Sequence, residues 1–191
     1  MITPPHHPAV ATLTPAATGA RAGAVTAALL CFAAVMIRLT VYALFLPEVR
    51  VPWLTCLIGT LPWTAVAAVV GGIAGRIAAR AKSVWSGSLI GIAFSVPVAL
   101  AYVLMLAVLF APSDLFPDGL VKMLLFAGSI GAVSGAVAWR FAGYRRDPGT
   151  ARPLQFSLLE LAMFVAAFAA YLASFASEVR QVVAWARSTG N

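Results

Sequence analysis

Five stretches of the chain are long, apolar and almost free of charge, with at most one charged residue in each. They cover residues 24–46, 52–74, 86–111, 120–139 and 158–175. A helix needs about 20 mostly apolar residues to cross the hydrocarbon core of a bilayer. Lipid offers no hydrogen-bond partner to an open sheet edge, and no strand-like alternation of polarity is present, so each stretch is expected to be helical. The sequence therefore predicts an all-α membrane protein, a bundle of five transmembrane helices.

The composition agrees with this class, because 62% of the 191 residues are hydrophobic and only 10% are charged. Soluble domains carry about 25% charged residues. The net charge of +7 comes from Lys and Arg residues that stand mainly at the ends of the apolar stretches, where orientation in a membrane requires them, so nucleic acid is not an expected partner. Cys31 and Cys56 both lie in apolar stretches and fit no metal or redox spacing.

The positive charges also predict how the chain is threaded. With the N-terminus in the cytoplasm, five crossings place four basic residues outside: Arg50, Lys122, Arg180 and Arg187. The same threading places twice as many inside: Arg21, Arg76, Arg80, Lys82, Arg140, Arg145, Arg146 and Arg152. The C-terminus is then expected outside. A fifth helix that lay on the surface or re-entered would instead leave the C-terminus in the cytoplasm.

The chain divides into a flexible N-terminal tail, a four-helix membrane unit, a cytoplasmic linker and a fifth helix with an amphipathic C-terminal extension. These parts cover residues 1–22, 23–146, 147–157 and 158–191. The tail is assigned because its Pro, Thr and Ala residues show no apolar periodicity. The fifth helix is expected to start at Leu158, because Ser157 and Glu160 have the spacing of a capping box.

The segment GGIAGRIAAR (71–80) is followed 60 residues later by the similar GAVSGAVAWR (131–140). Residues 21–80 and 81–140, aligned without gaps, are identical at 12 of 60 positions, where a composition this biased would give roughly a tenth by chance. The pattern favours a duplicated helical hairpin to which the fifth helix was added. Independent use of small residues at the same spacing is the alternative. Two hairpins of equal orientation would be related by an axis along the membrane normal.

Glycines spaced four residues apart mark one face on three of the predicted helices. They are Gly71 and Gly75, Gly87 and Gly91, and Gly131 and Gly135. In lipid no water drives helices together, so helices associate through close backbone contact, which small residues permit. These glycines are expected to pack helices against each other within the chain. The alternative is that one of these faces forms a homodimer.

Arg38 is the single charged residue of the first apolar stretch. It stands eight residues before Leu46, which is about 12 Å at the rise of an α-helix. A charge at that depth is costly and usually faces the bundle interior, so Arg38, Tyr42 and Tyr102 are the expected members of a polar intramembrane site. The alternative is that Arg38 only reaches toward the membrane surface or bonds helices together.

Two prolines interrupt the apolar stretches, Pro62 in the second and Pro97 in the third. Each frees a backbone carbonyl and is expected to kink its helix. Kinked helices line cavities in transporters, although they also occur as packing features.

Residue types that could carry catalysis are scarce. The six acidic residues form no intramembrane pair, and the apolar stretches contain neither a histidine nor a zinc-binding H-E-x-x-H motif. The protein is therefore expected not to be an enzyme and to hold no cofactor or metal.

The segment RPLQFSLLELAMFVAAFAAYLA (152–173) resembles the short Q-F-S-L-x-x-L membrane segment of many bacterial multi-pass membrane proteins that have no assigned activity. Basic residues precede the segment in those proteins, and here they are Arg145, Arg146 and Arg152. Leu159 and Glu160 stand where the usual version has a basic residue and a threonine. The resemblance implies a membrane anchor in a bacterial inner membrane and lends no functional residue.

Together, these features predict a non-catalytic structural or accessory membrane subunit that contacts lipid and either another membrane protein or a second copy of itself. The alternative is a small transporter or permease component in which Arg38 lines a polar site. The two functions predict different variants to be harmful. Arg38→Ala would abolish transport in the second case, whereas Gly75→Leu or Gly135→Leu would abolish association in the first.

Overall fold

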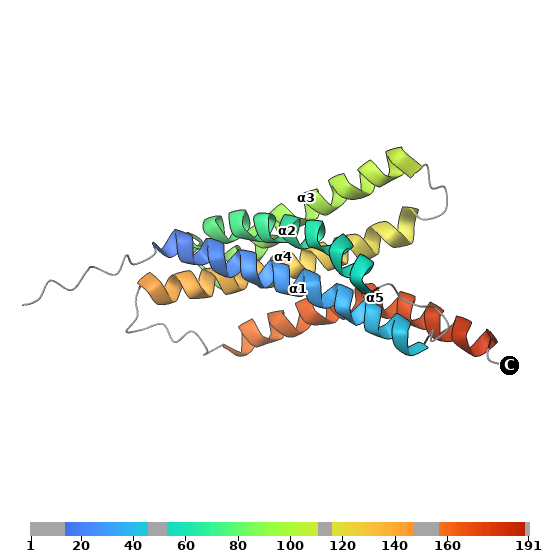
Figure 1. Cartoon of the computed structure of the whole chain (residues 1–191). Helices are drawn as coiled ribbons and strands as arrows, with labels where there is room; N and C mark the ends of the chain where they lie inside the picture. The colour runs from blue at the N-terminus through green and yellow to red at the C-terminus, as the bar shows by residue number, and fades with distance from the viewer. Residues whose placement is uncertain (1–13, 46–52, 111–115, 147–156, 190–191) are drawn as a thin grey trace, which may run out of the picture.

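The computed structural model describes residues 14–45, 53–110, 116–146 and 157–189, and all regular structure in these ranges is helical. Five helices follow one another: α1 (Pro15–Phe45), α2 (Trp53–Ala78), α3 (Val84–Phe110), α4 (Phe116–Arg146) and α5 (Leu158–Thr189). They run alongside one another in an elongated bundle (Figure 1). The described part of the chain is therefore the helical bundle that the sequence predicts.

Consecutive helices form two hairpins, because α1 packs most extensively on α2, and α3 on α4. Helix α1 also packs along α4 and so joins the two hairpins. Helices α2 and α3 contact each other much less than either contacts its hairpin partner. Helix α5 lies against α4 and, over a smaller area, against α1 (Figure 1).

Helix α1 begins at Pro15, so the predicted tail of residues 1–22 is too long at its C-terminal end. Thr14 caps the helix, since its Oγ1 accepts a hydrogen bond from the backbone N–H of Ala17 at 3.3 Å. Proline suits the first helical position, where a backbone N–H would have no intrahelical partner. Residues 1–13 of the predicted tail lie outside the described residues.

Other helices also extend past the predicted apolar stretches. Helix α4 continues from residue 139 to Arg146, and α2 ends at Ala78 rather than at residue 74. Apolar character marks only the part of a helix that suits lipid, whereas backbone hydrogen bonding continues until other partners satisfy the end of the helix. Helix α5 starts at Leu158 as predicted. Residues 147–156 of the predicted linker lie outside the described residues.

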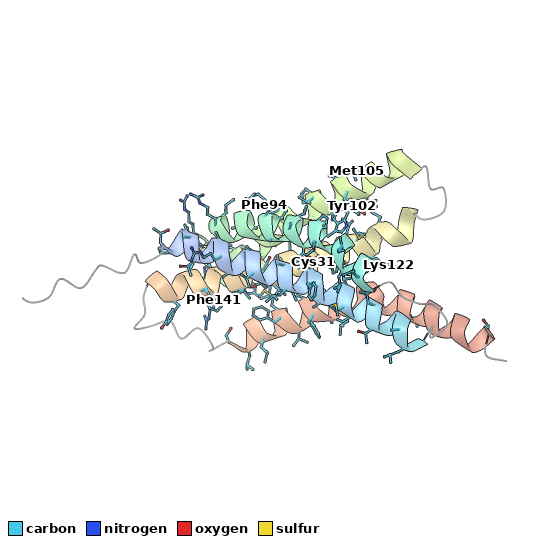
Figure 2. The ribbon with its side chains drawn as sticks, in the orientation of Figure 1. Cys31, Phe94, Tyr102, Met105, Lys122 and Phe141 are labelled. Atoms are coloured by element: carbon cyan, nitrogen blue, oxygen red, sulfur yellow. The ribbon has the colours of Figure 1, made fainter. Side chains whose placement is uncertain are left out.

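The interior of the bundle is built from small residues. Alanines with at most 2% of their surface exposed include Ala27, Ala34, Ala74, Ala78, Ala136 and Ala138. Large apolar side chains lie outside instead, and Leu29 is 62% and Leu61 63% exposed. Phe94 and Phe141 lie at opposite outer edges of the bundle (Figure 2). Such an arrangement suits hydrocarbon rather than water, because small residues let helices approach closely while the apolar surface remains exposed.

Within the described residues, four helices contain an apolar stretch long enough to cross a membrane: Pro15–Val41, Leu57–Ala78, Val84–Met105 and Leu120–Tyr144. The described apolar stretch of α5, Leu161–Ala173, is shorter. By length and composition, the structure therefore supports four of the five predicted membrane helices. Helix α5 is a further member of the same bundle.

Candidate functional site

Glycines hold the two helices of each hairpin at backbone distance. Gly19 and Gly23 of α1 meet Gly75 and Gly71 of α2, and Gly87 and Gly91 of α3 meet Gly135 and Gly131 of α4. A Cβ atom on Gly71 would lie 2.5 Å from the carbonyl oxygen of Gly23, and one on Gly131 would lie 2.5 Å from that of Gly91. Because no Cβ fits there, only glycine allows this approach. The six glycines singled out in the sequence therefore make contacts within the chain, and Gly19 and Gly23 join them.

The two sets of contacts differ in their spacing along the chain. Gly71 and Gly131 are 60 residues apart, but their partners Gly23 and Gly91 are 68 residues apart. The difference of eight residues is about two helical turns. An ungapped alignment of residues 21–80 with 81–140 therefore pairs the glycines of α2 with those of α4, but does not pair those of α1 with those of α3. The duplication remains a hypothesis.

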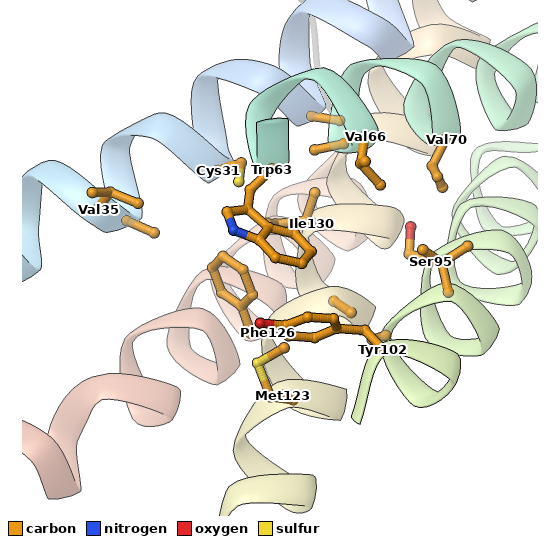
Figure 3. Close-up of a pocket in the computed structure, with 16 residues that line it drawn as sticks. Cys31, Val35, Trp63, Val66, Val70, Ser95, Tyr102, Met123, Phe126 and Ile130 are labelled. Atoms are coloured by element: carbon orange, nitrogen blue, oxygen red, sulfur yellow. The ribbon is translucent and has the colours of Figure 1, made fainter. Parts of the chain in front are cut away.

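Between the two hairpins lies a pocket of about 290 Å³ (Figure 3). Each of the helices α1 to α4 contributes one face to it, within residues 27–35, 63–70, 95–102 and 123–130. The lining residues recur every three or four positions, which is the spacing of a single helix face. The volume is close to the lower end of the range for small-molecule sites, about 300 Å³.

The pocket starts where the glycine contacts end. Val70 and Ile130, which directly precede Gly71 and Gly131 in the sequence, line one end of it. Further along, alanines take the place of glycines and leave space between the helices: Ala34, Ala67, Ala99 and Ala127. Close contact at one level of the bundle and short side chains at the next therefore create the cavity.

Both interior prolines stand beside the pocket, and each directly precedes a lining residue. Pro62 precedes Trp63 in α2, and Pro97 precedes Val98 in α3. Both helices continue through the proline. Because proline lacks a backbone N–H, each helix loses one hydrogen bond at the level of the pocket.

The pocket wall is apolar apart from a few neutral groups, namely the Ser95 hydroxyl, the Tyr102 phenol, the Trp63 indole N–H and the thiol of Cys31. The Trp63 and Tyr102 rings pack edge to face, with ring centroids 4.3 Å apart and planes inclined at 62°. Figure 3 shows these rings side by side at one end of the pocket, with Ser95 toward the other end. None of the described residues that line the pocket is charged.

The pocket is open on the side where α2 and α3 meet. Trp63 and Val66 of α2 are each 42% exposed, and Val98 of α3 is 40% exposed, although all three line the cavity. On the opposite side the lining residues Ala27 and Ile130 are only 2% and 6% exposed. Among the described residues, the cavity therefore opens on the flank of the bundle, between α2 and α3.

Helix α5 supports the closed side of the pocket. Its Tyr171 is 3% exposed and donates a hydrogen bond from its hydroxyl to the carbonyl oxygen of Leu30 on α1, at 3.0 Å. The Tyr171 ring also packs on Phe126 of α4, a lining residue, with centroids 5.6 Å apart. At the other end of the interface, the Ser88 hydroxyl of α3 lies 3.1 Å from the sulfur of Met163. Helix α5 thus contacts the bundle at two separate levels.

Of the three residues predicted to form a polar site, Tyr102 lines the pocket. Arg38 and Tyr42 belong to α1, but their side chains lie outside the described part of the structure. Position 38 is three residues past Val35, a lining residue, or about 4.5 Å further along the helix axis. Trp63 and Ser95, which also line the pocket, were not predicted from the sequence. The available signal in the sequence was that each of them stands close to a proline inside an apolar stretch, Trp63 beside Pro62 and Ser95 near Pro97.

The described ranges hold no cluster of three or more His, Cys, Asp or Glu side chains that could bind a metal ion. The pocket is the candidate site that the described residues of α1 to α4 form. Comparisons of the chain with protein-family models, with curated proteins and with solved structures find no match.

Proposed function

We propose that the protein is a non-catalytic membrane protein of the transporter or permease-component class, which binds a neutral and largely apolar molecule between its two hairpins. The pocket is the observation that carries this proposal. It is enclosed by four helices with candidate membrane spans, and its described wall has neutral polar groups but no charge. Such a wall favours neutral ligands, because a charged group would lose its hydration without gaining a partner.

The proposed location is a bacterial inner membrane, with the N-terminus in the cytoplasm and α5 as a fifth crossing. The path of α5 favours a crossing over a surface position. Met163 packs with Val84 at the start of α3, and Tyr171 packs with Ala27 and Ile130 nearer the middle of the bundle. With 32 residues, α5 is about 48 Å long, more than the hydrocarbon thickness of about 30 Å.

An accessory subunit is the second candidate. The glycine faces are the main sequence feature that favours such a subunit. In the structure, however, these glycines contact each other within the chain. A protein partner would therefore have to bind the large apolar side chains on the outside, such as Leu61 and Val69. Lipid chains suit that surface equally well, so no specific contact favours this function over the first.

Binding of farnesol, a neutral isoprenoid alcohol, tests the proposed function. Trp63 serves as the reporter in a delipidated, detergent-solubilised chain whose other four tryptophans are replaced by phenylalanine. We expect a saturable change in Trp63 emission, because the indole lines the pocket. The change should disappear in Ala67→Phe, which fills the pocket, and persist in Ala65→Phe, on an exposed position of the same helix. An emission change that rises linearly with farnesol in all three chains would contradict the proposal.

A further inference from the structure

We infer that the ligand of this pocket is an acyl chain of a bilayer phospholipid, which enters sideways between α2 and α3. This inference rests on the proposed function, since it names the ligand and the route for the same site. Three properties of the pocket carry it: the position of its opening, its depth in the bundle and the chemistry of its wall.

The opening lies on the outer surface of the bundle, where lipid chains would be. Trp63, Val66 and Val98 line the pocket and are also exposed between α2 and α3. These two helices contact each other much less than the helices within either hairpin do. Phe94 and Met105, which stand four residues before and seven residues after Val98 on the same side of α3, are apolar and exposed as well. A molecule already dissolved in the hydrocarbon can enter by this route without crossing water.

The pocket runs along the helices, as an acyl chain does in a bilayer. Its lining on α2 extends from Trp63 to Val70, which is about 10 Å along the axis. On α3 the lining extends from Ser95 to Tyr102, which is the middle of the apolar stretch 86–111. The pocket therefore lies at the level of the hydrocarbon core, where the acyl chains of a bilayer are.

The wall chemistry suits an acyl chain along the whole length of the pocket. The Trp63 and Tyr102 rings form one end of it and present large apolar faces there. The other end is apolar, with Val70, Ile130 and Ala99 around the lone Ser95 hydroxyl. No described lining residue is charged, so the pocket is expected to accept the chain without selecting a headgroup.

Photolabelling in bilayer nanodiscs tests this inference. The full chain is embedded with a phosphatidylcholine that carries a diazirine on one acyl chain, irradiated, and analysed by peptide mass spectrometry. We expect adducts on Ala99 and Ile130, which line the pocket and are only 9% and 6% exposed. Adducts are also expected on the outward-facing Leu61 and Leu89, which report ordinary contact with surrounding lipid. Phosphatidylglycerol with the same diazirine chain should give the same pattern.

Ala67→Phe should lose the adducts on the pocket wall and keep those on Leu61 and Leu89. Ala65→Phe, its matched control, should keep both sets. Ala127→Leu narrows the pocket from the opposite wall and should also reduce labelling of Ala99. Agreement between the two variants guards against a folding defect in either one. Retention of the outward adducts shows that each variant is still folded and embedded.

The remaining outcomes separate the failure of this inference from the failure of the proposed function. If the lipid labels only Leu61 and Leu89 while a diazirine-bearing farnesol labels Ala99 and Ile130, the acyl-chain inference is wrong and the binding function stands. If neither probe labels the pocket wall in the unmodified chain, both are wrong. Equal labelling of Ala99 in Ala67→Phe and in the unmodified chain would also overturn the inference, because the pocket would not be the route.

Discussion

Gly23 of α1 and Gly71 of α2 touch backbone to backbone, so that a Cβ on Gly71 would lie 2.5 Å from the carbonyl oxygen of Gly23 and 2.5 Å from the Cβ of Ala27. The same relationship joins Gly91 and Gly131 in the second hairpin. At one level of the bundle, these contacts hold the two helices of each hairpin at backbone distance. The pocket lies just past them, where alanines take the place of the glycines and leave space between the four helices.

Gly71→Ala should destabilise the protein by about 1–3 kcal/mol, because the added methyl group forces the two backbones apart. Thermal unfolding in mild detergent, followed by circular dichroism, measures the effect. The neighbouring Gly72→Ala is the matched control. Its Cβ would meet only ordinary contacts, at 3.5 Å from the Cβ of Ala24, so a neutral or slightly stabilising effect is expected. Equal loss of stability in the two variants would contradict the role given to the Gly23–Gly71 contact.

Tyr171→Phe should lower stability by about 0.5–1.5 kcal/mol, since it removes the hydrogen bond to Leu30 but keeps the ring packed on Phe126. Tyr144→Phe, on an exposed position of α4, is the control and should have no measurable effect. The same thermal measurement serves for both. No change in Tyr171→Phe would mean that the α1–α5 hydrogen bond does not contribute to holding α5 on the bundle.

Tyr102→Ala should weaken retention of farnesol by the purified chain, because the edge-to-face contact with Trp63 closes one end of the pocket and is worth about 0.5–1.5 kcal/mol. Tyr102→Phe keeps the ring and should retain most of the binding. The dissociation constant from the Trp63 emission titration gives the comparison. If Phe and Ala at position 102 weaken binding equally, the hydroxyl rather than the ring is the important group.

In the proposed threading α5 is a fifth crossing, and the C-terminus lies outside. In a chain without Cys31 and Cys56, Asn191→Cys should react with a membrane-impermeant maleimide in intact cells, as expected for five crossings with the N-terminus inside. Thr3→Cys should react only after the cells are permeabilised. Protection of both cysteines in intact cells would instead indicate four crossings, with α5 packed on the bundle without crossing.

The number of helices could be predicted from the sequence, because lipid leaves a long apolar stretch almost no other structure. The start of α1 could not. Gly19, Arg21 and Gly23 lack the apolar character of a span, and it is the backbone of α2 that makes Gly19 and Gly23 necessary. The glycine faces were visible in the sequence, but their partners were not, because the pairing of Gly23 with Gly71 depends on how the hairpin closes.

The candidate site was only partly predictable for a similar reason. Tyr102 drew attention as a polar residue in an apolar stretch, and it lines the pocket. Trp63 and Ser95 could not be predicted in this way, because a cavity is the space that neighbouring helices leave unfilled. The alanines that leave this space look like ordinary packing residues in a sequence: Ala34, Ala67, Ala99 and Ala127. Only the relative positions of the four helices distinguish an alanine that lines a cavity from an alanine in a tight contact.

The most direct test of the pocket as a binding site is the intact mass of the protein purified from native membranes in mild detergent, measured beside Ala67→Phe. We expect the 19.9 kDa chain, alone or as a homo-oligomer, to carry a small-molecule adduct that Ala67→Phe lacks. A stoichiometric second polypeptide without any such adduct would contradict this account and favour an accessory membrane subunit.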